Sequence, residues 1–218
     1  SNLEAVTEIR KLRASRDHKL GINWLEVEGS INKTETGFWI PEEVDRITEE
    51  VVRLLVEERF EGTVGVVTPF RRMANAIQQQ IEASCIHQSI LDACEFRADT
   101  AHKFQGDERD IIFYAPCYNP SMPNKHKWFL SSQKNVFNVA LSRARSSFIV
   151  VGSKEAMKTC KIEYLEDFVR YVDDLQSPSR DRQPPIGIKR GHWEPILEKR
   201  LIEEGIPVKA QFSLGPYW

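Results

Sequence analysis

The 218-residue sequence lacks a long apolar run, a closely spaced cysteine pair and a large net charge. No apolar stretch approaches the roughly 18 residues that a membrane span needs. The charged N-terminal segment also has no apolar core of the signal-peptide kind. We therefore expect a cytoplasmic protein that makes no membrane contact.

The four cysteines lie far apart, with no CxxC pair and no clustered histidines. Such spacing predicts reduced thiols and no metal site. The net charge of −2 argues against a free-standing nucleic-acid binder, which is usually basic. It still permits a domain that adds a few backbone contacts to those of a partner domain.

Short apolar, β-rich runs alternate with helical patterns, which predicts an α/β fold with a mainly parallel sheet. The expected strands cover residues 22–27, 63–67, 110–115 and 147–151, with a short one at 96–99. One expected helix begins at Pro41, and the others cover 70–83, 128–145 and 162–175.

The composition changes near the C-terminus. Residues 176–191 are rich in Pro, Gly, Ser and Arg and are typical of a linker. Residues 192–218 offer one helix, a stop at Gly205 and the start of a strand, too little to build a core. We expect a first domain at 1–175, followed by a tail that either docks on it or opens a second domain.

Three segments carry candidate chemistry. In the first, a buried strand runs into Thr68 and Pro69 and then into a helix. Strand ends that open into helix N-termini bind ligands in α/β sheets, and their free N–H groups favour phosphate. Arg71 and Arg72 oppose the helix dipole there, so they indicate either an anionic partner or two solvated arginines.

The second segment, ADTAHKFQGDERD, places polar residues and one glycine before an apolar strand. Gly106 would allow a close backbone approach to a ligand. Thr100 and His102 could donate to a phosphate, and Glu108 could accept from a sugar hydroxyl. The alternative is a helix-to-strand turn with capping residues.

The third segment, NVFNVALSRAR, is expected to be a helix that ends in Arg143 and Arg145. Residues two apart on a helix point to nearly opposite sides, so the two arginines should do different jobs. An arginine at the border of the core can stabilise charge on a transferring phosphoryl group. The alternative is two cations placed favourably at a helix C-terminus.

In order and spacing, the segments TPF, DTAHKFQGDERD and FNVALSRAR resemble motifs IV, V and VI of the second RecA-like domain of superfamily-1 helicases. The 5′-to-3′ branch that includes the nonsense-decay helicases is the most similar. The resemblance covers residues 21–158 and implies a three-layer RecA-like P-loop-NTPase fold. A partial α/β extension would follow it.

The resemblance implies roles in a nucleotide site. Arg143 would be the arginine finger that reaches the γ-phosphate of ATP. Gly106 and Glu108 would approach the nucleotide, with Glu108 near the ribose, and Gln105 would couple the cleft to the strand track. Arg145 would be structural or a second charge in the cleft.

The resemblance also implies contacts with single-stranded DNA or RNA. Thr100 and His102 would touch the nucleic-acid backbone or the domain interface, and Thr68 and Pro69 would line the strand track. One position departs from the pattern: many relatives have Gln where this chain has Met73. The role of that glutamine is therefore in doubt here.

The sequence has no GxxxxGK[ST] phosphate loop and no strand that ends in a magnesium-binding Asp-Glu pair. We expect both in an N-terminal RecA-like domain of the same polypeptide, before Ser1. ATP and Mg²⁺ would then be cofactors of the full-length enzyme. The fragment alone is expected to bind neither and to be inactive.

The tail WEPILEKRLIEEGIPVKAQFSLGPYW resembles the first helix and strand of Vsr-like nucleases of the PD-(D/E)xK type, with Glu194 as a remnant of the metal site. The nuclease would be incomplete at Trp218, and the alternative is a helix packed on the first domain. Two other functions stay open: a catalytically silent RecA-like docking module, and a motor that serves a fused endonuclease.

Overall fold

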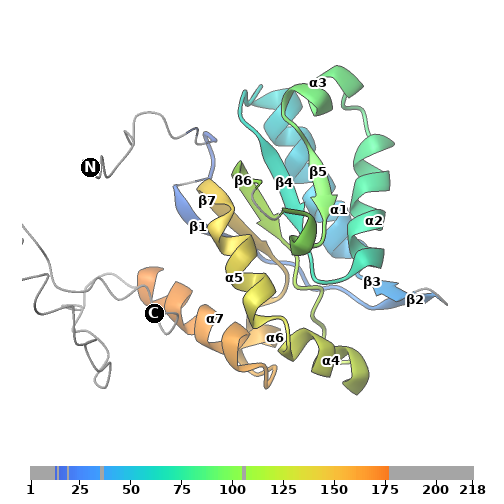
Figure 1. Ribbon diagram of the computed structural model, residues 1–218, viewed down its shortest axis with the longest axis vertical. Helices are drawn as coiled ribbons and strands as arrows, with labels where there is room; N and C mark the ends of the chain where they lie inside the picture. The colour runs from blue at the N-terminus through green and yellow to red at the C-terminus, as the bar shows by residue number, and fades with distance from the viewer. Residues whose placement is uncertain (1–12, 14, 19, 35–36, 105–106, 177–218) are drawn as a thin grey trace, which may run out of the picture. The chain divides into compact units, whose positions relative to one another are not determined.

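Helices and strands alternate along the chain, as Figure 1 shows for the computed structural model. The structure describes residues 13, 15–18, 20–34, 37–104 and 107–176. The strands are β1 (Gly21–Leu25), β2 (Asn32–Thr34), β3 (Gly37–Trp39), β4 (Val64–Val67), β5 (Arg97–Asp99), β6 (Arg109–Tyr114) and β7 (Ala144–Val151). The helices are α1 (Pro41–Val52), α2 (Arg71–Glu82), α3 (Gln88–Ala93), α4 (Asn124–Ser131), α5 (Lys134–Ser142), α6 (Lys154–Lys158) and α7 (Glu163–Gln176). Two further turns are π-helical η2 (Arg53–Glu57) and 3-10 helical η3 (Ala101–Phe104).

The chain divides into two units, residues 1–166 and 167–218. Of the second unit, the structure describes residues 167–176, the last part of α7. The expected linker from residue 177 onward, and the whole nuclease-like tail with Glu194, lie outside the described residues. The sheet and all other predicted site residues belong to the first unit.

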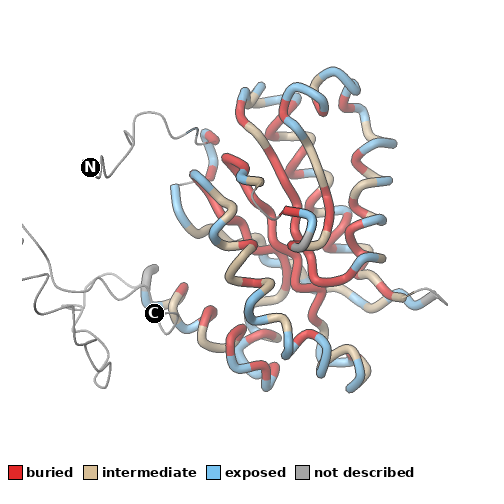
Figure 2. Tube along the Cα trace, in the orientation of Figure 1, coloured by how far each residue is buried: buried red, intermediate tan, exposed pale blue. Residues whose placement is uncertain are grey.

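Five strands form one sheet in the order β1-β7-β6-β4-β5, and every neighbouring pair is parallel. The apolar runs of β4 and β6 are buried along their whole length, as continuous rather than alternating apolar strands require. Figure 2 shows these strands in red at the centre of the sheet. The five expected strands are therefore confirmed, with small shifts at their ends.

Helices cover both faces of the sheet, with α1 and α2 on one side and α5 on the other (Figure 1). α1 begins with Pro41 at its first turn, and Val44, Ile47 and Val51 form its buried stripe. On the other face Phe137 of α5 packs edge-on against Tyr114, with ring centroids 5.2 Å apart. The α/β class and the three layers are confirmed.

The single helix expected at residues 128–145 was wrong. α4 ends at Ser131, α5 begins at Lys134, and Arg145 lies on strand β7. At the break, the hydroxyls of Ser131 and Ser132 donate to the carbonyls of Trp128 and Phe129. Such local bonds compete with the backbone hydrogen bonds of a helix and end α4. After α5, the β-branched and aromatic residues of the run SSFIVV favour strand β7. The hairpin of β2 and β3 was not expected.

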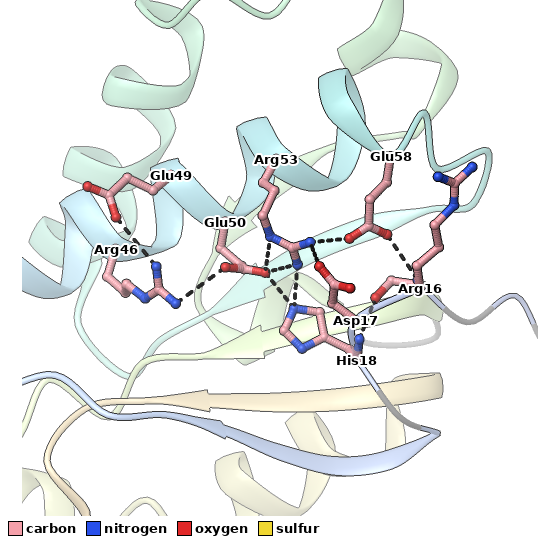
Figure 3. Close-up of polar contacts among 9 residues, drawn as sticks. Arg16, Asp17, His18, Arg46, Glu49, Glu50, Arg53 and Glu58 are labelled. Carbon is pink, nitrogen blue, oxygen red and sulfur yellow. Dashed lines mark hydrogen bonds and ion pairs between the residues drawn. The ribbon is translucent and has the colours of Figure 1, made fainter.

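A cluster of charged side chains ties the segment before β1 to helix α1 (Figure 3). His18 and Glu50 are both buried, and the His18 Nε2 to Glu50 Oε1 distance is 2.7 Å. Arg53 adds ion pairs with Glu50, Asp17 and Glu58. Burial alone would raise the pKa of Glu50, but the hydrogen bonds from His18 and Arg53 outweigh it and lower that pKa to about 2.

We predict that Glu50→Gln lowers the free energy of unfolding at pH 7 by about 3–5 kcal/mol, because it removes the buried carboxylate that pairs with Arg53 and bonds His18. The folded pKa lies below the ordinary 4.5, so this stability is present above pH 4.5 and is lost as the pH falls through about 2. Urea unfolding at several pH values measures it. The matched change Glu49→Gln, in an exposed ion pair, should cost less than about 1 kcal/mol; equal losses would contradict the account.

A second carboxyl is buried without compensation. Glu43 on α1 is 1% exposed, and its Oε2 has no hydrogen-bond partner among the described residues. Burial raises its pKa well above 4.5, and repulsion from Glu42 adds to this effect. A Cβ on Gly152, which has φ +142°, would lie 3.1 Å from Glu43 Oε1, so glycine leaves room for this side chain.

We predict that Glu43→Gln stabilises the fold at neutral and higher pH. The folded state holds a proton that the unfolded state releases above about 4.5, so wild-type stability falls as the pH rises from 4.5 towards the raised folded pKa. The amide cannot ionise, so the variant should lose this decline. Thermal unfolding from pH 5 to pH 8 measures it, and parallel pH profiles for the two proteins would show that Glu43 does not carry the effect.

Among the described residues, no helix is long and apolar enough to cross a membrane.

Candidate functional site

The second and third segments meet at the amino ends of β6 and β7. These strands pair in parallel, with Arg109 opposite Ala144, and the Arg109 N–H donates to the Arg143 carbonyl at 2.9 Å. Because both segments enter the sheet at this edge, the pairing places Glu108 beside the stretch from Arg143 to Arg145. The sequence predicted these residues for one site, and the structure brings them together.

Glu108 is held by Arg145. Arg145 Nε lies 3.1 Å from Glu108 Oε2, and both side chains are half-exposed. A second carboxylate steadies the arginine, with Asp110 Oδ1 at 3.9 Å from its Nη1. Asp110 is itself fixed by Thr63, whose N–H and hydroxyl donate to its Oδ2 at 2.8 and 3.1 Å. Arg145 therefore orients Glu108 from a strand, not from the helix that the sequence predicted.

Arg143 differs from its neighbours in lacking a counter-charge. It caps the C-terminus of α5 and is partly buried, and its Nη2 donates to the Ser142 hydroxyl at 3.2 Å. Its Nε is buried without a hydrogen-bond partner, and no carboxylate among the described residues pairs with it. By contrast, Arg109 pairs with Asp107 at 2.6 Å, and Arg145 pairs with Glu108. Arg143 is thus a cation at the border of the core, and its guanidinium has N–H donors that no described residue accepts.

Turn η3 follows the carboxyl end of β5. Phe104 of this turn is fully buried over β4. A Cβ on Gly65 would lie 2.8 Å from its ring, so only glycine on β4 allows the turn to approach this closely.

The first segment lies at the opposite edge of the sheet. Thr68 follows β4 and is 0% exposed, and Pro69 is also buried. The Thr68 N–H donates to the Asp99 carbonyl at 3.2 Å, and the Thr100 N–H donates to Asp99 Oδ1 at 2.7 Å. Thr68 and Thr100 therefore lie close together. That Thr68 and Pro69 line the single-strand track stays a prediction, and both residues are buried in this structure.

Asp99 forms ion pairs with two arginines at this edge, and the sequence did not predict a role for it. Its carboxylate pairs with Arg71 at 2.6 Å and with Arg97 at 3.2 Å. The anionic partner expected for Arg71 is thus a carboxylate of the same chain. Arg72 lies over the ring of Trp39, with its guanidinium carbon 4.5 Å from the centroid. Met73, at the position of the missing glutamine, is fully buried and serves packing.

Several predicted residues cannot be placed. Gln105, Gly106 and Glu194 lie outside the described residues, and His102 is described in its backbone only, within η3.

No group of His, Cys, Asp and Glu among the described residues could hold a metal ion. Cys94, Cys117 and Cys160 are buried free thiols, and burial raises the pKa of each. Cys85 is free and exposed.

Residues 3–155 match the family model of an AAA domain. Helicase sen1 of Schizosaccharomyces pombe is 31% identical over 113 residues, which are 52% of this chain and 6% of that protein. Over 141 residues, mov-10-B.1 of Danio rerio is 26% identical, covering 59% of this chain and 14% of its own. DNA polymerase alpha-associated DNA helicase A of Saccharomyces cerevisiae is 25% identical over 142 residues, 64% of this chain and 20% of that protein. The chain thus spans only 6% to 20% of these relatives.

We predict that Asp99→Asn lowers the free energy of unfolding by about 1–3 kcal/mol, because charge-assisted bonds to Arg71 and Arg97 are lost at a nearly buried position. Chemical denaturation measures the change. Asp92→Asn is the matched control and should be close to neutral, because the Asp92 side chain is exposed and accepts a hydrogen bond from the neighbouring Gln88. Equal effects of the two substitutions would contradict the role of Asp99.

Proposed function

Since the chain belongs to the AAA-domain family that forms the C-terminal RecA-like part of Upf1/Sen1/Mov10-type superfamily-1 helicases, we propose that it is one half of an ATP-dependent DNA or RNA translocase. This half supplies an arginine to the nucleotide and part of the path of the single strand. The other half of the nucleotide site comes from a second RecA-like domain of the longer protein.

The observation that carries the proposal is Arg143. Its guanidinium is anchored at the border of the core, and among the described residues its buried Nε has no partner and no carboxylate neutralises it. A buried donor left unpaired costs free energy, about 1–3 kcal/mol, so its retention points to an anion that joins it in the working enzyme. A phosphate of ATP fits this donor set, because guanidinium groups bind phosphate oxygens through paired N–H bonds.

Glu108 and Arg145 complete the site on this chain. The Glu108 carboxylate is half-exposed beside Arg143 and can accept hydrogen bonds from a ribose hydroxyl. Arg145 is a positioning residue that holds Glu108 in place. ATP, when bound, supplies the phosphoanhydride bond whose hydrolysis drives movement along the single strand. Arg143 then stabilises negative charge, and the carboxylate orients the sugar.

We predict that Arg143→Ala in the longer protein lowers the nucleic-acid-stimulated ATPase kcat by roughly 10³-fold or more, as loss of an arginine finger does. Arg143→Lys should recover little, since an ammonium lacks the planar fork of donors. Steady-state phosphate release at saturating ATP and oligonucleotide measures both variants.

Arg16→Gln is the control, because Arg16 is exposed and makes its described contact, with Glu58, through its backbone N–H. Its kcat should equal that of the wild type. An unchanged kcat in Arg143→Ala would overturn the assignment. A longer protein with no ATPase at all would instead favour a catalytically silent docking module.

A further inference from the structure

Helix α4 presents a large aromatic side chain to solvent. Trp128 is 73% exposed, more than any other large apolar side chain of the described residues, and Phe129 beside it is 38% exposed. A lone exposed apolar residue needs no explanation. Trp128, however, lies in a run that also contains cations and other aromatic residues.

The exposed face of α4 is basic. Lys125 precedes Trp128 by three positions and Phe129 by four, so all three side chains emerge on one face of the helix. Lys127 lies over the ring of Tyr118, with its Nζ 5.4 Å from the centroid. The eight residues NKHKWFLS contain two lysines, one histidine and no acid. Such a face repels cationic partners and attracts anionic ones.

Aromatic contacts hold α4 against the first predicted segment. Phe129 contacts Phe70, the residue after Pro69, with ring centroids 5.4 Å apart. His126 contacts Phe38 of β3 at 4.7 Å, and Phe38 contacts Phe70 at 4.6 Å. These ring contacts hold α4 beside the carboxyl end of β4, on the edge of the sheet away from Arg143.

We propose that this face of α4 binds single-stranded nucleic acid, with a base stacked on the Trp128 indole and the backbone phosphates paired with Lys125. The proposal rests on the proposed function and adds a contact outside the three segments. An exposed aromatic ring flanked by cations is the arrangement that single-strand binders use, since every base has a π-face and every link carries a negative charge. It also supplies the exposed side chains that buried Thr68 and Pro69 do not.

Fluorescence anisotropy of the 218-residue chain with fluorescein-labelled oligo(dT) and oligo(U) at low salt tests the proposal. Trp128→Ala should weaken binding roughly 10-fold or more, the effect expected for losing one stacked base. Trp128→Phe should restore a large part of the affinity, because a phenyl ring still stacks. The exposed position of Trp128 predicts unchanged unfolding curves for both variants.

The salt dependence tests the cation separately. Lys125→Gln should lower the slope of log affinity against log salt by about 0.7, which corresponds to one lost phosphate contact with a single strand. Arg16→Gln removes the same charge from an exposed side chain near η2 and should leave the slope unchanged.

Two results would overturn the proposal. One is wild-type affinity in Trp128→Ala and Lys125→Gln, and the other is no binding by the wild-type chain while the longer protein keeps its Arg143-dependent ATPase. In either case the proposed function stands and α4 is not a strand contact. A change in self-association of Trp128→Ala, with unchanged oligonucleotide binding, would assign this face to a protein contact instead.

Discussion

The parallel pairing of β6 with β7 is the constraint on which the candidate site depends. One backbone hydrogen bond, from the Arg109 N–H to the Arg143 carbonyl, brings together two segments that are more than thirty positions apart in the printed sequence. The pairing continues through the buried rungs Ile111–Ser147 and Phe113–Ile149, so the sheet core fixes the position of the exposed residues. The strand pairing itself therefore places Glu108 close to Arg143.

Strand β6 separates the residues proposed to bind the nucleotide from those proposed to bind the single strand. β6 has six residues, which at roughly 3.3 Å per residue span about 20 Å. Glu108, Arg143 and Arg145 lie at its amino edge, whereas Thr100, the Phe70 cluster and α4 belong to the carboxyl edge. Turn η3 follows Thr100 and packs over Gly65 of β4 through Phe104.

The sequence predicted the elements whose apolar patterns are strong, and the structure confirms them. The runs VGVV and IIFYA are typical of strands buried on both faces, and the stripe from Val44 to Val51 indicated a helix. The break at Ser132 was missed because the polar run 131–135 contains no Pro or Gly to mark a helix end, while the hydroxyl bonds that end α4 depend on geometry. The role of Asp99 was missed for a related reason, since ion pairs between distant segments leave no periodic signal. Arg145 was expected on a helix, and the structure places it on β7, where it pairs with Glu108.

Hydrogen–deuterium exchange of the longer protein, with each ligand added separately, tests the separation of the two edges most directly. A non-hydrolysable ATP analogue should protect amides at 107–110 and 141–146, and a single-stranded oligonucleotide should protect those at 68–72 and 124–129. Each pattern should appear without the other when one ligand is present. Protection of 124–129 by the nucleotide alone, or of 141–146 by the oligonucleotide alone, would contradict the account.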